Sequence, residues 1–187
     1  QVHGFLSKPA LLRSGAQVGD ILAVSGTLGD AGAALDLLSF VSSEKRVFSS
    51  NENFLLSRYY KPSPRIELGR LLLDCATSCI DISDGLLAEA EHISKKSSVA
   101  ILIDSSLLPL SPELVAFKGL EIAKKMALTA GDDYELLFTI PRSKWPDLVS
   151  ALPVGAVTEV GIIQAGSGLE LDGISSKKFR KGFQHFE

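Results

Sequence analysis

Short apolar runs alternate with longer amphipathic stretches along this chain, and turn-forming residues separate them. Runs of four to eight residues favour strands, whereas helices usually need ten or more residues to show their periodicity. The pattern predicts strands at 2–6, 20–25, 79–82, 99–103, 135–140, 156–163 and 168–172. It predicts helices at 31–41, from a cap at Asn51 or Asn53 to Tyr60, and at 65–76, 86–96, 112–126 and 143–152.

The order of these elements indicates an α+β fold. Strands and helices interleave, but they do not follow a strict βαβ alternation, so helices packed on a mixed β-sheet fit best. With 187 residues, 45% of them hydrophobic, the chain is long enough for one domain with a substantial core. Its first residues resemble the tail of a strand, and the chain does not start with Met, so we expect a fragment or a processed form.

Composition narrows the range of partners. A net charge of −3 gives no general attraction to nucleic acid or to an acidic membrane, so any phosphate binding must be local. No apolar run approaches the roughly 18 residues that a membrane span requires. Cys75 and Cys79 lack the companions of a zinc site or a disulfide framework, and we expect buried free thiols in a reducing compartment.

The stretch IDISDG at 80–85 places Asp81, Ser83 and Asp84 between an apolar strand and a helix start. Helix capping by Ser or Asp is the common explanation of such a turn. A magnesium site is the alternative, because Mg²⁺ takes one or two carboxylates together with water and phosphate oxygens. One cap needs one side chain, and an unpaired Asp81 at the end of an apolar strand would be costly to bury. A cation would resolve both difficulties.

A second acidic turn, at 130–135, brings Asp132 and Asp133 directly before an apolar strand. Asp and Gly are ordinary turn formers, but one of these carboxylates could face the end of the sheet and bind a cationic group. Arg13 lies in a polar link and is either a solvated surface residue or a bidentate phosphate ligand.

Three further segments have plain structural explanations. The glycine turn at 26–30 is best explained as a tight connection with Asp30 at a helix start, although its backbone could cradle phosphate. The segment KPSPR at 61–65 is a helix break, because residues before proline avoid the α region. Phe183 in the aromatic tail packs in the core or in a lid, or stacks on an aromatic ligand.

Several common catalytic patterns are absent from the sequence. It contains no P-loop, G-x-G-x-x-G, G-x-S-x-G or H-E-x-x-H motif. The three histidines lie far apart in the sequence and have no visible nucleophile partner. We therefore assign no acid–base role to any of them.

An ordered set of short motifs in this chain resembles the thiamine-monophosphate kinases. The motifs are VHGF (2–5), LRSGA (12–16), SGTLGD (25–30), PSPR (62–65), IDISDGL (80–86), GDDYEL (131–136) and the tail KGFQHF (181–186). No single motif decides the matter, but the set is specific and spans nearly the whole chain.

The resemblance implies the fold of the C-terminal domain of the aminoimidazole ribonucleotide synthetase superfamily. Residues 1–20 would be the end of an N-terminal-domain strand and the interdomain link, and 21–187 the C-terminal α/β domain. The family's N-terminal domain would be absent, together with most of its metal-binding aspartates. The family also implies ATP bound between the two domains, a homodimer when full length, and a cytoplasmic enzyme.

The resemblance also assigns roles to individual residues. It implies that Mg²⁺ is held by Asp81 and Asp84, that ATP is contacted by Arg13 and Ser83, and that thiamine lies against Asp132 and Phe183. Two departures stand out: Asp132 replaces a usual glutamate and is one methylene shorter, and Arg180 replaces a common tryptophan.

The implied reaction transfers the γ-phosphoryl group of ATP to thiamine monophosphate, giving ADP and thiamine diphosphate. The acceptor is already anionic and needs no general base; charge repulsion is the obstacle, and metal ions with alignment overcome it. We expect this chain alone to be inactive. The alternatives are another ATP-dependent synthetase of the superfamily and a non-catalytic module that binds nucleotide or thiamine phosphate.

Overall fold

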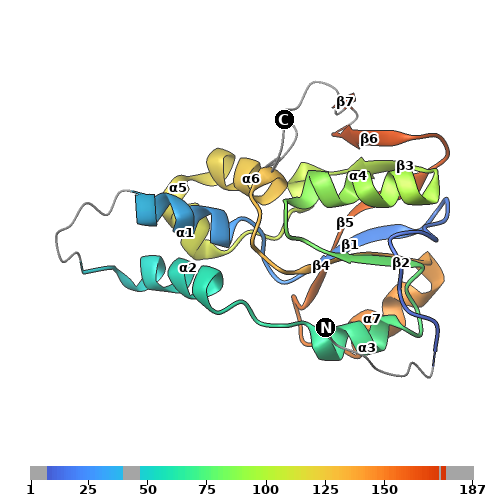
Figure 1. The fold of residues 1–187 in the computed structure, drawn as a ribbon, viewed down its shortest axis with the longest axis horizontal. Coiled ribbons are helices and arrows are strands. Elements are labelled where there is room, and N and C mark those ends of the chain that lie inside the picture. Colours follow the sequence, from blue (N-terminus) through green and yellow to red (C-terminus); the bar gives the residue numbers. More distant parts are fainter. Residues whose placement is uncertain (1–7, 40–46, 173, 176–187) are drawn as a thin grey trace, which may run out of the picture.

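The computed structural model describes residues 8–39, 47–172 and 174–175. A mixed sheet with the strand order β2-β4-β1-β5-β3-β6-β7 forms its centre (Figure 1). The strands are β1 (Ile21–Ser25), β2 (Ser78–Asp81), β3 (Ala100–Ile103), β4 (Leu136–Ile140), β5 (Val157–Gln164), β6 (Gly168–Leu171) and β7 (Ile174–Ser175). Neighbouring strands are antiparallel except for β3 and β6, which are parallel. The predicted α+β class with a mixed sheet is confirmed.

Helices cover both faces of the sheet and gather at one end of it. They are α1 (Asp30–Ser39), α2 (Ser50–Tyr60), α3 (Ile66–Leu72), α4 (Leu86–Ser97), α5 (Pro112–Lys118), α6 (Leu120–Thr129) and α7 (Trp145–Ser150). Figure 1 shows α4 over one face, α3 and α7 over the other, and α1, α2 and α5 grouped beside the sheet. The layered arrangement leaves the ends of β2 and β4 next to the helical group.

The alternation of side chains along β1 explains the two sheet faces. Leu22 and Val24 join the core beneath α4, whereas Ile21 and Ala23 join the core against α3 and α7. All five β1 residues are buried, as expected for a central strand covered on both faces. A third core lies among α1, α2, α5 and α6 and includes Leu37, Leu55 and Leu114.

Three helix predictions need correction. The helix expected at 112–126 is divided into α5 and α6 at Gly119, whose φ of 78° is incompatible with a continuous helix. The helix expected at 65–76 ends at Leu72, whose carbonyl accepts the N–H groups of Cys75 and Ala76 in a closing turn. The N-cap of α2 is Ser49, which forms a capping box with Glu52.

The expectation that both thiols are buried is also wrong. Cys75 and Cys79 are free and only half-buried. Burial nevertheless raises the pKa of Cys79 to about 12, so this side chain stays a neutral thiol. The strand expected at 2–6 and the aromatic tail lie outside the described residues.

Candidate active site

The two acidic turns lie side by side at one edge of the sheet. Strands β2 and β4 are antiparallel, with Asp81 opposite Leu136, so the turn that follows β2 meets the turn that precedes β4. Three backbone hydrogen bonds then join the turns. Asp132 donates to Ser83 (2.9 Å), Tyr134 to Ile82 (2.9 Å), and Ile82 to Glu135 (2.7 Å).

Two glycines permit this close approach. A Cβ atom at Gly131 would overlap the carbonyl oxygen of Ser83, and one at Gly85 would come within 2.9 Å of the carbonyl carbon of Thr129 and within 3.1 Å of the carbonyl oxygen of Ala130, where the second turn begins. These obstacles are backbone atoms, which cannot move aside without displacing the turns. The glycines in the two motifs therefore serve the contact between them.

Gly131→Ala is expected to lower the free energy of unfolding by about 2 kcal/mol, because overpacking against a fixed backbone forces a shift. Urea denaturation would measure this. The matched control is Gly69→Ala in α3, where an added Cβ would meet nothing within 4 Å. That substitution should instead stabilise the helix by about 0.5–1 kcal/mol. Equal effects at the two positions would contradict the close contact.

The first turn does not act as a helix cap. The N-cap position of α4 is Gly85, and no side chain caps it. Asp81 is exposed at the end of β2, so the cost expected for burying its carboxylate does not arise. The capping interpretation is wrong, because neither Asp81 nor Ser83 caps α4.

A residue that the sequence did not reveal holds this turn in place. Glu89 of α4 is 3% exposed, and its carboxylate accepts hydrogen bonds from the Ser83 hydroxyl and the Asp84 N–H, both at 3.3 Å. Burial raises the pKa of Glu89, and the nearby Asp84 charge adds to the rise. Glu89 of α4 thus holds the Ser83–Asp84 segment in place through these two hydrogen bonds.

Side chains of the second turn alternate between the interior and the surface. Asp133 and Glu135 are buried, Asp132 is half-buried, and Tyr134 is 44% exposed. Asp132 and Tyr134 both have positive φ angles, 66° and 51°, which is a costly conformation for residues other than glycine. The Tyr134 hydroxyl donates to Asp132 at 3.2 Å, and this bond and the Asp132 charge raise the pKa of Tyr134. Such strain at a surface turn points to a functional role for the outward pair.

Asp133 faces inward and does not bind a cationic group. Its carboxylate accepts the N–H groups of Gly29 (2.6 Å) and Ala31 (3.2 Å), at the start of α1. Burial raises its pKa to about 7, against the lowering effect of these two bonds. The sequence left open which aspartate faces the site, and the structure leaves Asp132 for that role.

Asp133 should therefore make stability depend on pH. Its ordinary pKa is 3.8, so the unfolded chain loses this proton near pH 4 and the folded chain near pH 7. The contribution of this group to stability falls as the pH rises through that interval. In Asp133→Asn the dependence disappears, because any mismatch of the amide with the backbone donors is independent of pH.

The free energy of unfolding of Asp133→Asn relative to the parent should rise by about 3 kcal/mol between about pH 4.5 and about pH 7. Urea denaturation at the two pH values measures this difference. Asp147→Asn, at an exposed position of α7, is the control. Parallel pH profiles for the parent and Asp133→Asn would contradict the assignment.

Glu135 anchors the far end of the second turn through two arginines. It is 1% exposed and pairs with Arg58 of α2 at 2.8 Å and with the Nε and one terminal nitrogen of Arg65, while the Ser25 hydroxyl also donates to it. Burial would raise the pKa of Glu135, but these bonds and the Arg65 charge lower it on balance. Arg65 belongs to the segment that the sequence explained only as a helix break.

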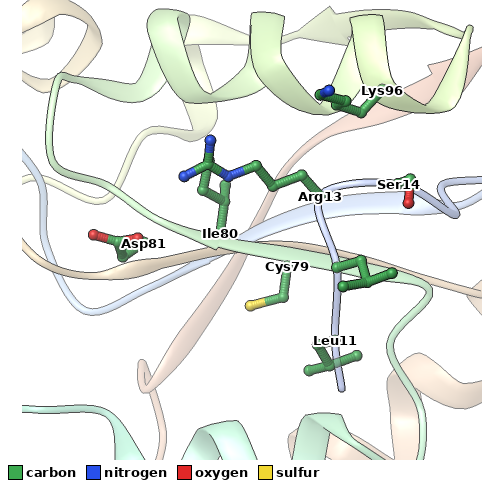
Figure 2. A pocket seen from close by; sticks show the side chains of 8 residues that line it. Leu11, Arg13, Ser14, Cys79, Ile80, Asp81 and Lys96 are labelled. Carbon is green, nitrogen blue, oxygen red and sulfur yellow. The ribbon is translucent and has the colours of Figure 1, made fainter. Parts of the chain in front are cut away.

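An open hollow of about 410 Å³ lies along β2 beside the first turn. Arg13, Ser14, Lys96 and Asp81 contribute polar groups to it. Figure 2 shows the Arg13 side chain extending along β2 toward Asp81, with Lys96 above it on α4. The carbonyl of Leu12 accepts the Cys79 N–H at 2.9 Å, which fixes the segment carrying Arg13 against the edge of the sheet.

The oxygen donors of the first turn fit partial coordination of Mg²⁺. Within the part of the chain that the structure describes, no group of three or more Asp, Glu, His or Cys side chains could hold a metal ion. Two carboxylates, Asp81 and Asp84, remain on one short turn, and Mg²⁺ commonly takes one or two carboxylates beside phosphate and water. The remaining ligands would come from phosphate, water or residues outside the described part.

The expected site residues thus fall into three groups. Asp81, Ser83, Asp84 and Asp132 lie on the two joined turns. Arg13 shares the hollow with Asp81. Phe183 lies outside the described residues, as does Arg180. Glu89, Tyr134 and Glu135 were not predicted.

Comparisons with known proteins show which proteins the chain is similar to. No protein-family model matches the chain. It is 39% identical to the thiamine-monophosphate kinase of Aquifex aeolicus over 93% of its length and 38% identical to that of Escherichia coli K12 over 99%. The chain spans only 54% and 58% of these two relatives.

Solved structures give the same result. AaThiL complexed with AMPPCP and TMP superposes with a TM-score of 0.83 at 38% identity, over 94% of this chain and 54% of that one. The hydrogenase maturation protein HypE of E. coli superposes with a TM-score of 0.65 at 22% identity, over 88% of this chain and 51% of that one, which shows a shared fold alone.

The mixed sheet, its helical layers and these neighbours define the class as the C-terminal domain of the aminoimidazole ribonucleotide synthetase-like fold. Within that class, the chain belongs with the thiamine-monophosphate kinases and corresponds to their C-terminal part. In the described segments, no helix has both the length and the apolar character needed to cross a membrane.

Proposed function

We propose that this chain supplies the C-terminal part of the active site of a thiamine-monophosphate kinase. The reaction transfers the γ-phosphoryl group of ATP to thiamine monophosphate and yields ADP and thiamine diphosphate. The observation that carries the proposal is the pair of acidic turns, hydrogen-bonded to each other at one sheet edge, in a chain 39% identical to such a kinase. The structure of AaThiL with AMPPCP and TMP supports it further.

Each site residue in the described part of the chain has a role suited to its surroundings, and the role of Phe183 follows from the family resemblance. Asp81 and Asp84 would hold Mg²⁺, and the ion when bound would offset the negative charge of the phosphates. Arg13 and Ser83 contact the nucleotide, since a guanidinium can bind phosphate with two donors. Asp132 and Phe183 lie against thiamine, whose thiazolium cation is attracted by a carboxylate.

Alignment is the main task of the protein in this reaction. Both reactants are anionic, so placing them in line and reducing their repulsion accounts for most of the rate increase. The Glu89 and Glu135 contacts serve this purpose by fixing the two turns before any substrate binds.

The proposal also covers the domain organisation, oligomeric state and cellular location of the full-length protein. Residues 1–20 form the end of an N-terminal-domain strand and a link, 21–187 form the C-terminal domain, and a separate N-terminal domain completes the metal and ATP sites. The full-length enzyme is a homodimer in the cytoplasm and uses Mg²⁺ with ATP.

The full-length protein is expected to convert ATP and thiamine monophosphate to ADP and thiamine diphosphate, whereas the isolated 187-residue chain should show no turnover. Chromatographic quantification of thiamine diphosphate measures both. Absence of product from the full-length protein would contradict the kinase assignment. Tight binding of thiamine monophosphate without turnover, measured by calorimetry, would instead favour a binding module.

A further inference from the structure

The buried cluster of Arg58, Arg65 and Glu135 has no place in the phosphoryl transfer itself. We propose that Arg65 and Arg58 are positioning residues, which act through Glu135 to hold Asp132 and Tyr134 in the orientation that the substrate requires. The inference deepens the proposed function and rests on it for the identity of the substrate.

The geometry gives Glu135 a complete set of partners. Arg65 donates to one Glu135 oxygen from Nε at 2.6 Å and to the other from its terminal nitrogen, while Arg58 donates to the second oxygen at 2.8 Å. The Ser25 hydroxyl adds a donor from the end of β1. Side-chain exposure is 13% for Arg58, 31% for Arg65 and 1% for Glu135, so the cluster is largely shielded from water. Bidentate pairing of this kind fixes direction as well as distance.

Anchoring Glu135 also restrains the exposed part of the turn, because neighbouring side chains in the turn point in opposite directions. Asp133 and Glu135 point inward, so the Tyr134 between them is directed outward, and Asp132 precedes the inward pair. Asp132 and Tyr134 hold positive φ angles that an unrestrained turn would leave. Inward anchors on both sides of Tyr134 therefore keep the outward pair in its strained conformation.

The two arginines come from a segment with little freedom of its own. Arg65 is the N-cap residue of α3 and follows Pro62 and Pro64, which restrict the backbone leading to it. Arg58 lies near the end of α2 and also donates to Asp30 and to the Thr27 carbonyl. Within the described residues, the hydrogen bonds of the Arg65 side chain all go to Glu135, so a substitution of Arg65 tests the link with the fewest other changes.

The first measurement is independent of any substrate. In the 187-residue chain, hydrogen exchange of the Asp132 and Tyr134 amides, which donate to Ser83 and Ile82, reports on the order of the turn. Arg65→Ala should speed their exchange at least about tenfold, while amides of β1 keep their rates. If Arg65→Ala does not fold, Arg65→Lys is used, because lysine keeps the charge but cannot form the fork. The control is Arg70→Ala, whose partner Glu67 forms an exposed pair on the same helix.

The second measurement uses the full-length enzyme. Arg65→Lys should raise the KM for thiamine monophosphate at least about tenfold and change the KM for ATP less than about threefold. The reason is that only the residues that contact thiamine monophosphate lose their fixed orientation. Arg70→Ala should leave both unchanged. A merely structural role would reduce the active fraction, and thus the apparent kcat, with both KM values intact.

The outcomes separate the two proposals. Unchanged exchange at Asp132 and Tyr134, or equal changes in both KM values, would overturn the positioning role. A parent enzyme that makes no thiamine diphosphate would contradict the kinase function, whereas faster exchange in Arg65→Ala would still support the link between Arg65 and the turn.

Discussion

Asp84→Asn in the full-length enzyme is expected to lower kcat at least about 100-fold, through the loss of metal positioning. Asparagine keeps the size of the side chain but replaces an anionic oxygen with a neutral one, which binds Mg²⁺ more weakly. The turn itself should persist, because its backbone bonds to Asp132 and Tyr134 and the Glu89 contact do not require the Asp84 charge. Steady-state kinetics at several Mg²⁺ concentrations measure the effect.

Three controls make this result specific. The melting temperature of Asp84→Asn should stay close to that of the parent, and a higher Mg²⁺ concentration should restore part of the activity. Asp147→Asn, at an exposed position of α7, should leave kcat and its Mg²⁺ dependence unchanged. Near-normal kinetics for Asp84→Asn would count against Asp84 as a metal ligand.

Glu135→Gln is expected to lower the free energy of unfolding by about 3 kcal/mol. Removing one member of a buried ion pair leaves its partners without compensation, and here two arginines share the one carboxylate. The partial exposure of Arg65 places the expected loss toward the lower end of the range for such pairs. Urea denaturation near neutral pH measures the loss, because Glu135 has a lowered pKa and is fully charged there.

A surface pair provides the comparison. Glu67→Gln removes the partner of Arg70, and both side chains are more than two-thirds exposed, at 83% and 72%. Its cost should stay below about 0.5 kcal/mol. If Glu135→Gln cost no more than Glu67→Gln, the buried cluster would not stabilise the fold. Combining Glu135→Gln with Arg65→Met should give less than the sum of the single losses, since the two residues act as one unit.

Local sequence patterns predicted a strand or helix correctly where the spacing of apolar residues and the flanking turn residues indicated the same element. The strand expected at 135–140 is β4, and the helix expected at 86–96 is α4, because apolar spacing and flanking turn residues agree there. The helix at 112–126 failed because a single glycine with positive φ outweighs the helical pattern on either side of it. The predicted N-cap of α2, Asn51 or Asn53, was wrong because the helix begins earlier, where Ser49 and Glu52 form a capping box.

The candidate site was predictable only in part. Consecutive turn residues identified both acidic turns, and the antiparallel pairing of β2 with β4 then brings them together. Glu135 and its arginines are separated by 70 and 77 positions in the sequence, and no local pattern links them. The inward direction of Asp133 and Glu135 had one available signal: the two residues are two apart at the entry to a strand, and residues so spaced share a face.

The segment that carries Arg13 also closes an open border of the sheet. Among the described strands, β2 has a neighbour on one side only, and on its other side the Cys79 N–H already donates to the Leu12 carbonyl. A foreign strand could add to this border only by displacing residues 11–14, and Arg13 would leave its hollow with them. This short segment therefore has two effects: it protects the edge of the sheet against unwanted assembly, and it places Arg13, one candidate nucleotide contact.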